Sequence, residues 1–363
     1  MKAARIIISG GGTGGHIFPA IAIANALKTI QPNCEILFVG ANGRMEMEKV
    51  PAAGYPIKGL NIAGLQRSLS LSNLSFPLKV IGSLLHARKI IQEFKPDVAV
   101  GVGGYASGPL LFVASLMGIP TLIQEQNSFA GITNKILGKR AKKICVAYEG
   151  MEKFFPKERL ILTGNPVRKD ILNMIGKKEL AYAKFNLDPT KPVLLSIGGS
   201  LGARTINESL LEACEKLEKS GVQVLWQTGK AYYQKAKDKY SKLIQVHEFI
   251  KEMDLVYAVA DVVVSRAGAS SISELCIVAK PCILVPSPNV SEDHQTKNAM
   301  ALVNKNAAIL VKDSEAKTQL VDSALALLAN RTQQDSLKKE IAKLALPNSA
   351  DEIAMEVLKL ANG

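Results

Sequence analysis

The residues best suited to chemistry form a glycine-rich loop that carries a histidine near the N-terminus. The loop reads SGGGTGGH at 9–16, after an apolar run at 5–8 and before an apolar helical pattern at 17–24. This order predicts a buried strand, a loop and a helix. Glycines let a ligand approach the backbone, and the free N–H groups of a helix start favour phosphate. Because imidazole titrates near neutral pH, His16 adds a candidate base to a phosphate-type loop.

The loop can be compared with two common nucleotide-binding motifs, the dinucleotide GxGxxG motif and the Walker P-loop. It formally contains GxGxxG, but a dinucleotide site also needs an acid at the end of the second strand. The expected second strand ends at Val39 and continues as Gly-Ala-Asn-Gly, which argues against NAD. No Lys-Ser/Thr pair follows the loop, so a Walker P-loop is excluded. A structural role for His16, in the core or at the helix start, remains the alternative.

Further polar and glycine-rich segments follow other expected strands of the first half. One is GVGGYASGP at 101–109, and another is QEQN at 124–127. Open α/β sheets bind ligands at the carboxyl ends of their strands. Four consecutive hydrogen-bonding side chains suit the hydroxyls of a sugar, with a solvent-exposed turn as the alternative.

A comparable segment in the second half reads SRAGASSISE at 265–274. The backbone N–H groups of Ala269, Ser270 and Ser271 could bind a phosphate at a helix start. Glu274 lies one turn further and could accept hydrogen bonds from ribose hydroxyls. Two alternatives stay open for Glu274: an acid that complements the helix dipole, or a capping box with Ser271.

The elements that must position these residues alternate between apolar strands and helical patterns. Continuous Val, Ile and Leu runs are typical of strands covered on both faces, and strand–helix alternation predicts parallel sheets. We expect strands at 5–9, 35–39, 98–102, 121–124, 144–147, 193–197, 222–227, 244–249, 262–265 and 283–285. The fold class is therefore α/β, with two doubly wound parallel-sheet domains.

The domain boundary is predicted from a weak internal repeat, because both halves of the chain begin with a strand and a glycine loop. A second strand and glycine loop, LLSIGGSLGA, opens the second half at 194–203, and a hinge is plausible at Gly164-Asn165-Pro166. We expect one domain at 1–166, joined by a C-terminal helix at 347–363, and a second at 167–346.

Composition limits the possible partners. Of the net charge of +13, +10 falls on residues 1–166, which predicts an anionic partner such as nucleic acid or a membrane surface. Five cysteines without CxxC spacing are expected to be free thiols. No signal peptide or membrane span is expected. Scattered histidines without HxxxH or DxD spacing predict no metal site.

The stretch 65–89 combines apolar and basic residues. Such a surface can dock on anionic lipid headgroups, although a core helix with a solvated basic face would have a similar pattern. The candidate membrane patch is Phe76, Leu78, Lys79, Ile81, Leu85 and Arg88.

Six motifs occur in a fixed order along nearly the whole chain. They are Gly11-Gly12-Thr13-Gly14-Gly15-His16, Gly103-Gly104-Tyr105, Gln126-Asn127, Gly164-Asn165-Pro166-Val167-Arg168, Gly198-Gly199-Ser200-x-Gly202-Ala203 and Arg266-x-Gly268-x5-Glu274. The ordered set closely resembles the peptidoglycan N-acetylglucosaminyltransferases (the MurG family).

This resemblance implies a GT-B fold, in which two Rossmann-like domains face a cleft. It implies inverting transfer of GlcNAc from UDP-GlcNAc to the muramyl C4 hydroxyl of lipid I, giving lipid II, with neither cofactor nor metal. The partners would be UDP-GlcNAc, lipid I, the anionic inner-membrane surface, and other cell-wall synthesis or division proteins, without nucleic acid. The location would be cytoplasmic and peripheral on the cell membrane.

The resemblance also assigns site residues. His16 would be the catalytic base. The acceptor side would hold Thr13, His16, Gly104, Tyr105 and Glu125. Within the donor site, Glu274 would bind ribose, the Ile250 backbone would read uracil, and Arg168 would hold diphosphate. The complete donor set is Thr13, Gly14, Gly15, Asn127, Arg168, Ser200, Phe249, Ile250, Met253, Ala269, Ser270, Ser271, Glu274 and Gln295.

Two positions depart from the family pattern. The family often has histidine where this chain has Gln124, and tends to glutamine where it has His294. Two other functions remain possible from the sequence. One is another UDP-sugar enzyme of this fold, such as a glycolipid synthase or an epimerase. The other is a non-catalytic nucleic-acid binder, although the aromatic content of 5% disfavours it.

Overall fold

The computed structural model describes residues 3–62, 76–199 and 201–363, without the side chains of 76–79 and 291. Two compact units divide the chain. The first is Met1–Val167 with Asn348–Gly363, and the second is Arg168–Pro347.

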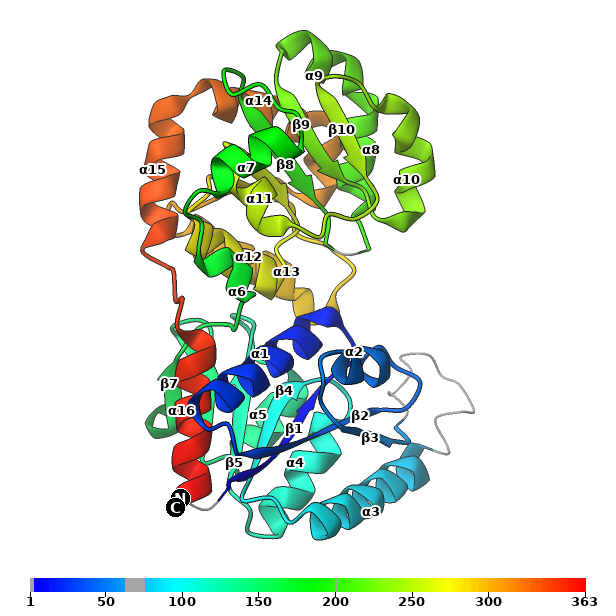
Figure 1. Cartoon of the computed structure of the whole chain (residues 1–363), viewed down its shortest axis with the longest axis vertical. Coiled ribbons are helices and arrows are strands. Elements are labelled where there is room, and N and C mark those ends of the chain that lie inside the picture. The colour runs from blue at the N-terminus through cyan, green and yellow to red at the C-terminus, as the bar shows by residue number, and fades with distance from the viewer. Residues whose placement is uncertain (1–2, 63–75, 200) are drawn as a thin grey trace. The chain divides into compact units, whose positions relative to one another are not determined.

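Within its described residues, the first unit contains a seven-stranded parallel sheet of order β3-β2-β1-β4-β5-β6-β7 (Figure 1). Its strands are β1 (Arg5–Gly10), β2 (Glu35–Ala41), β3 (Ile57–Leu60), β4 (Val98–Gly103), β5 (Thr121–Glu125), β6 (Lys143–Val146) and β7 (Leu160–Leu162). Its α-helices are α1 (Gly14–Ile30), α2 (Glu46–Ala52), α3 (Phe76–Phe94), α4 (Ser107–Leu116), α5 (Ile132–Gly138) and α16 (Ser349–Asn362).

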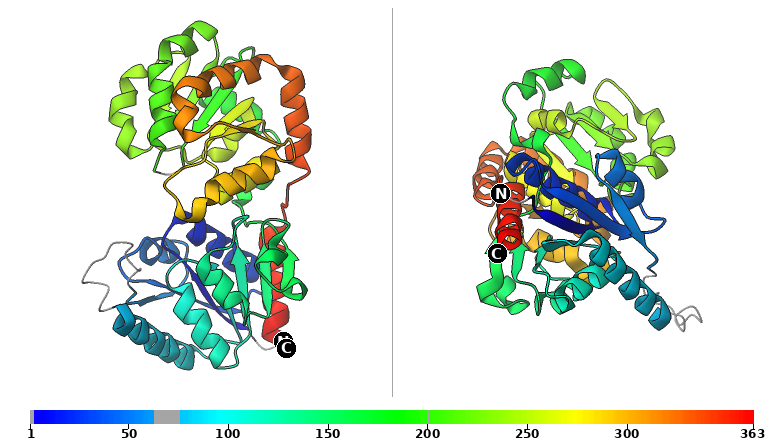
Figure 2. Two further views of the ribbon diagram at one scale, coloured as in Figure 1. Left: turned by 180° about the vertical axis from the view of Figure 1, so that it is seen from behind. Right: turned by 60° about the horizontal axis from the view of Figure 1, so that its bottom comes forward.

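Both faces of this sheet are covered, which explains the continuous apolar runs. Ile6 and Ile8 point to one face, where they share a core with α1 and α16. Ile7 points to the other face and packs with α3 and α4. Figure 2 shows these helices from two further sides. The C-terminal helix α16 thus belongs to the core of the first unit, where Ile353 and Val357 are fully buried.

The second unit contains a six-stranded parallel sheet of order β10-β9-β8-β11-β12-β13 among its described residues. Its strands are β8 (Val193–Ile197), β9 (Gln223–Gln227), β10 (Ile244–His247), β11 (Val262–Ser265), β12 (Cys282–Leu284) and β13 (Ile309–Leu310). Its α-helices are α6 (Lys169–Leu172), α7 (Lys177–Lys184), α8 (Arg204–Glu212), α9 (Cys214–Ser220), α10 (Lys230–Ala236), α11 (Met253–Val259), α12 (Ala269–Val278), α13 (His294–Val303), α14 (Ala316–Ala329) and α15 (Arg331–Ala342).

The predicted fold class is confirmed, since both sheets are parallel and alternate with helices. Three short strands, β3, β7 and β13, were not predicted, and each lies at the edge of its sheet. The five cysteines are free and buried, as expected. Among the described helices, none has the length and apolar character that crossing a membrane requires.

Candidate active site

The predicted glycine loop holds His16 in one orientation. Strand β1 ends at Gly10, helix α1 begins at Gly14, and the His16 Nδ1 atom lies 3.0 Å from the Gly11 carbonyl oxygen. Because a carbonyl only accepts hydrogen bonds, the Nδ1 atom must carry the proton in this contact. In the neutral imidazole, the Nε2 atom then carries the lone pair, which is the form that a base requires. His16 is partly exposed, so this geometry suits a general base.

The second glycine loop packs directly against the first. Gly103 and Gly104 have φ angles of +102° and +92°, which disfavour side chains. A Cβ atom on Gly103 would lie 2.6 Å from the His16 Cδ2 atom, and one on Gly104 would lie 2.4 Å from the Gly11 oxygen. Two motifs 87 residues apart (16 to 103) therefore form one surface, and both need glycine for the close approach.

The side chain of Tyr105 is 53% exposed beside this surface. The Arg44 guanidinium carbon lies 5.8 Å from the centre of its ring, within cation–π distance. Sequence reasoning missed Arg44, because it follows a glycine turn without any motif. It supplies a cation near the residues predicted for the acceptor side.

The polar segment at 124–127 is mostly buried. Gln124 donates to the Asn165 Oδ1 atom at 2.8 Å, and Gln126 donates to the Val102 carbonyl at 2.6 Å. The interpretation of four sugar-facing side chains is therefore wrong for Gln124 and Gln126, which are 0% and 4% exposed. They provide hydrogen bonds inside the protein, where buried polar groups need partners.

The carboxylate of Glu125, predicted for the acceptor side, is also buried. One oxygen accepts from the Asn127 backbone N–H at 3.0 Å, and the other accepts from the Asn134 side chain at 2.8 Å. Gly131 donates its N–H to this second oxygen at 3.2 Å. Glu125 thus shapes the loop that presents Asn127, the partly exposed member of the segment.

A buried acid that sequence reasoning missed lies under the first glycine loop. Glu46, 1% exposed at the start of α2, accepts from the Gly12 N–H at 2.9 Å and from the Ala41 N–H at 3.0 Å. No acid follows β2 directly, as the sequence showed, but the first turn of the next helix supplies one. It binds protein backbone in this structure.

In the second unit, Arg168 and Glu274 are the two charged residues that were predicted to bind the donor, and they form an ion pair with each other. The Arg168 Nε and Nη2 atoms lie 3.2 and 3.4 Å from the two carboxylate oxygens of Glu274. The hydroxyl of Tyr257, which is fully buried, donates to the Glu274 Oε2 atom at 3.1 Å. Burial raises the pKa of the Glu274 carboxyl, while Arg168 and Tyr257 oppose that rise.

The helix that carries Glu274 begins at the predicted phosphate turn. Helix α12 starts at Ala269 with Gly268 as its N-cap, so the capping-box alternative with Ser271 is wrong. The predicted residues Ala269, Ser270 and Ser271 form its first turn, where backbone N–H groups lack helical acceptors. This arrangement favours an anionic group at the end of β11.

Ser271 and Gln295 line one cavity of about 390 Å³. The same cavity is lined by Gly198, Gly199 and Gly202, which belong to the glycine-rich loop after β8. Its size and mixed lining suit a small polar ligand. Ser200, predicted for the diphosphate, lies outside the described residues.

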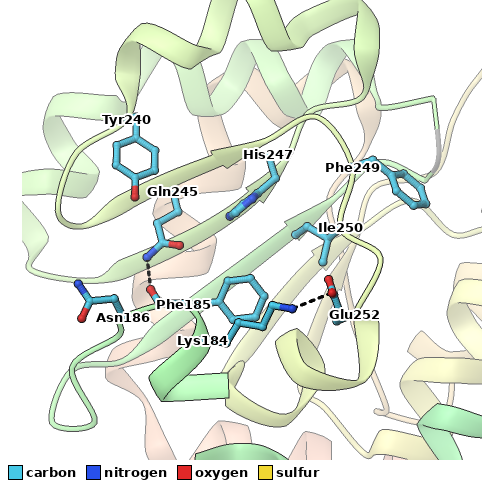
Figure 3. A pocket seen from close by; sticks show the side chains of 9 residues that line it. All are labelled: Lys184, Phe185, Asn186, Tyr240, Gln245, His247, Phe249, Ile250 and Glu252. Carbon is cyan, nitrogen blue, oxygen red and sulfur yellow. Dashed lines mark hydrogen bonds and ion pairs between the residues drawn. The ribbon is translucent and has the colours of Figure 1, made fainter. Parts of the chain in front are cut away.

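The residues predicted for the nucleobase follow β10. Met253 and Ile250 are buried, whereas Phe249 is 52% exposed. The Ile250 N–H donates to the Gln227 Oε1 atom at 2.8 Å. A nucleobase that accepts a hydrogen bond from this N–H must therefore displace the Gln227 side chain. Phe249 and Ile250 belong to the lining of a second cavity of about 410 Å³, and Figure 3 shows the Phe249 ring at its edge, pointing away from the other labelled side chains.

Two protein-family models together match most of this chain. Residues 6–146 match the model of the glycosyltransferase family 28 N-terminal domain, and residues 193–353 match that of its C-terminal domain. The chain belongs to glycosyltransferase family 28.

Individual relatives of this family agree with the assignment over the full length. A protein of Cytophaga hutchinsonii is 60% identical over 99% of this chain and 98% of its own. One of Phocaeicola vulgatus is 58% identical over 99% and 96%. Both are named UDP-N-acetylglucosamine--N-acetylmuramyl-(pentapeptide) pyrophosphoryl-undecaprenol N-acetylglucosamine transferase.

A solved structure of the same family supports the fold. The crystal structure of Acinetobacter baumannii MurG is 29% identical and covers 98% of this chain, with 99% of its own chain covered and a TM-score of 0.80. The resemblance inferred from the ordered motifs is therefore confirmed.

The predicted membrane patch of this glycosyltransferase lies on α3. The Ile81 and Leu85 side chains are 53% and 62% exposed, and Arg88 is exposed one turn further along the same face. Ala87, Ile90 and Ile91 pack into the core. The side chains of Phe76, Leu78 and Lys79 lie outside the described residues.

The site contains no candidate metal centre in the part of the chain that the structure describes. There, no three side chains of histidine, cysteine, aspartate or glutamate are grouped so that they could hold a metal ion.

Proposed function

We propose that this glycosyltransferase transfers GlcNAc from UDP-GlcNAc to the muramyl C4 hydroxyl of lipid I, forming lipid II and UDP. The observation that carries the proposal is the 60% identity, over 99% of the chain, to a relative named for this transfer. The two glycine loops and the first turn of α12 support it, because they suit phosphate groups and a sugar acceptor.

The donor would bind mainly to the second unit. Ribose hydroxyls would donate to Glu274, and the diphosphate would accept from Arg168 and from the N–H groups at 269–271. Because Arg168 contacts Glu274 in this structure, donor binding exchanges that ion pair for two ligand contacts. Ser271 and Gln295, which line the same cavity, would contact the diphosphate and the GlcNAc hydroxyls.

His16 would take the proton of the acceptor hydroxyl on its Nε2 atom. The acceptor oxygen forms a bond to C1 of GlcNAc while the bond from C1 to the UDP oxygen breaks. The electron pair of the broken bond stays on UDP, where Arg168 and the start of α12 stabilise it. Attack from the face opposite UDP inverts the configuration at C1.

The acceptor is membrane-bound, so the enzyme must reach a bilayer surface. Exposed Ile81 and Leu85, next to the basic residue Arg88, support a peripheral contact through α3. The charge excess of residues 1–166 favours an anionic surface such as the inner face of the cytoplasmic membrane.

The catalytic assignment is tested by replacing His16 with alanine. With UDP-GlcNAc and a detergent-soluble lipid I analogue, we expect His16→Ala to lower kcat by about 10²–10⁴-fold. The KM for UDP-GlcNAc should stay within threefold, because the proposed base contacts the acceptor. His86→Ala, an exposed histidine of α3, is the matched control. If His16→Ala lowers kcat less than tenfold, His16 is not the catalytic base.

A further inference from the structure

We propose that Glu46 is a positioning residue that sets the orientation and tautomer of His16. This inference rests on the proposed function only in taking His16 as the base. Glu46 does not contact the imidazole itself; its carboxylate lies beneath the glycine loop and is 1% exposed. The interaction passes through one peptide group.

That peptide group joins Gly11 to Gly12. Its N–H, on Gly12, donates to the Glu46 Oε2 atom at 2.9 Å, and its carbonyl, on Gly11, lies 3.0 Å from the His16 Nδ1 atom. The N–H and C=O of a trans peptide lie in one plane and point in opposite directions. Fixing the N–H on Glu46 therefore fixes the carbonyl toward His16.

The electrostatic consequence follows the same path. A carboxylate that accepts from one end of a peptide polarises it, and polarised hydrogen bonds in series strengthen one another. The Gly11 carbonyl thus becomes a better acceptor for the Nδ1 proton. This favours the tautomer in which the Nε2 atom carries the lone pair.

The surrounding backbone makes room for this carboxylate. A Cβ atom on Gly11 would lie 2.3 Å from Glu46 Oε1, and one on Gly40 would lie 2.5 Å from Glu46 Cγ. The second carboxylate oxygen accepts from the Ala41 N–H at 3.0 Å, which anchors Glu46 to the end of β2. Gly11, directly after β1, and Gly40, in the neighbouring strand β2, therefore enclose the carboxylate.

The test compares Glu46→Gln with Glu48→Gln in the full-length chain. Glutamine keeps the shape, but its NH₂ group cannot accept from a backbone N–H, so one of the two contacts is lost. Glu48 lies on the same helix, is exposed and bonds to Lys49, so its replacement is the control. Gly40→Ala is a second variant, which displaces Glu46 by steric contact and leaves its charge in place.

Three measurements are made on each variant. We expect Glu46→Gln and Gly40→Ala to lower kcat at least tenfold with a KM for UDP-GlcNAc within twofold. Nitrogen NMR of the His16 ring, assigned with His16→Ala, should show protonated Nδ1 in the parent and a tautomer mixture in both variants. The Gly12 amide should lose hydrogen-exchange protection in Gly40→Ala, and either the Gly12 or the Ala41 amide should lose it in Glu46→Gln. Glu48→Gln should match the parent in all three.

The ring spectrum separates this inference from the proposed function, because it is read without substrate. If the tautomer and Gly12 protection change but His16→Ala remains active, Glu46 positions His16 and the base is a different group. If the His16 spectrum and Gly12 protection of both variants match the parent, the positioning role is wrong, whatever the activity.

Discussion

His16 and Glu274, the two residues with the central roles in the proposed reaction, are both fixed by partners far away in sequence. His16 contacts the Gly11 carbonyl, which belongs to a peptide that Glu46 binds. Glu274 is bound by Arg168, 106 residues earlier, and by Tyr257. In each case a buried group orients the side chain before any ligand arrives, as effective sites require.

The contact between Tyr257 and Glu274 leads to a prediction on donor binding. Tyr257→Phe removes one hydrogen bond to a carboxylate, which is worth about 1 kcal/mol or more. We expect the KM for UDP-GlcNAc to rise about fivefold at pH 7.5, with kcat unchanged, in a steady-state assay. Tyr232→Phe is the matched control, because it also removes a hydrogen bond from tyrosine to glutamate, to Glu208 at 2.9 Å, and neither residue lines either cavity.

The KM for UDP-GlcNAc of the same variant should depend on pH through the protonation of the Glu274 carboxyl. In the proposed donor complex, ribose hydroxyls donate to the ionised form of Glu274. Because burial raises the pKa of this carboxyl, the KM should rise as the pH falls through that pKa. Tyr257 lowers the pKa by its hydrogen bond. Tyr257→Phe should therefore move the rise to higher pH. If the KM–pH profile of Tyr257→Phe matches that of the parent, Glu274 does not bind the ribose.

At the scale of elements, the strands that the sequence revealed are those with both faces covered. Strands such as β1 and β4 are continuous apolar runs because helices pack on either side. Strands β3, β7 and β13 were missed because they are short, partly exposed edge strands. Their residues are therefore not required to be uniformly apolar.

The candidate site divides in a similar way. Glycine loops at strand ends, His16, Glu274 and the start of α12 could be predicted, since each belongs to a local strand–loop–helix pattern. The supporting contacts could not. Glu46 reaches Gly12 across 34 residues, and the side chain of Gln124 bonds to Asn165 across 41. A local pattern contains no information about such pairs, which only the packing of the sheet creates.

Helix α3 gives the prediction at this scale. Replacing Ile81 and Leu85 together with serine removes two exposed apolar side chains and leaves the buried face intact. We expect binding to vesicles of phosphatidylglycerol to weaken about tenfold in co-sedimentation, because less apolar surface enters the interface. Activity on a detergent-soluble acceptor should not change.

The matched control for this variant is Leu180→Ser on α7, since Leu180 has the same 62% exposure as Leu85. It should sediment with vesicles as the parent does. If the α3 double variant and the parent partition equally, the membrane contact lies on another surface.

For the whole molecule, the division into two units fits the asymmetry of charge. The first 166 residues carry +10 of the +13 net charge and include the loop of His16 and the exposed face of α3. The second unit carries the Arg168–Glu274 pair and the start of α12. This separation matches a reaction in which an anionic, lipid-linked alcohol and a nucleotide sugar are bound by different domains.

Analysis of the products tests the proposed transfer most directly. The full-length chain is incubated with UDP-GlcNAc and a lipid I analogue, and mass spectrometry follows both substrates. We predict that the analogue gains one N-acetylhexosamine for each UDP released, and that omission of the analogue stops UDP release. An acceptor of unchanged mass, or conversion of UDP-GlcNAc to its epimer without any acceptor, would contradict the proposed transfer.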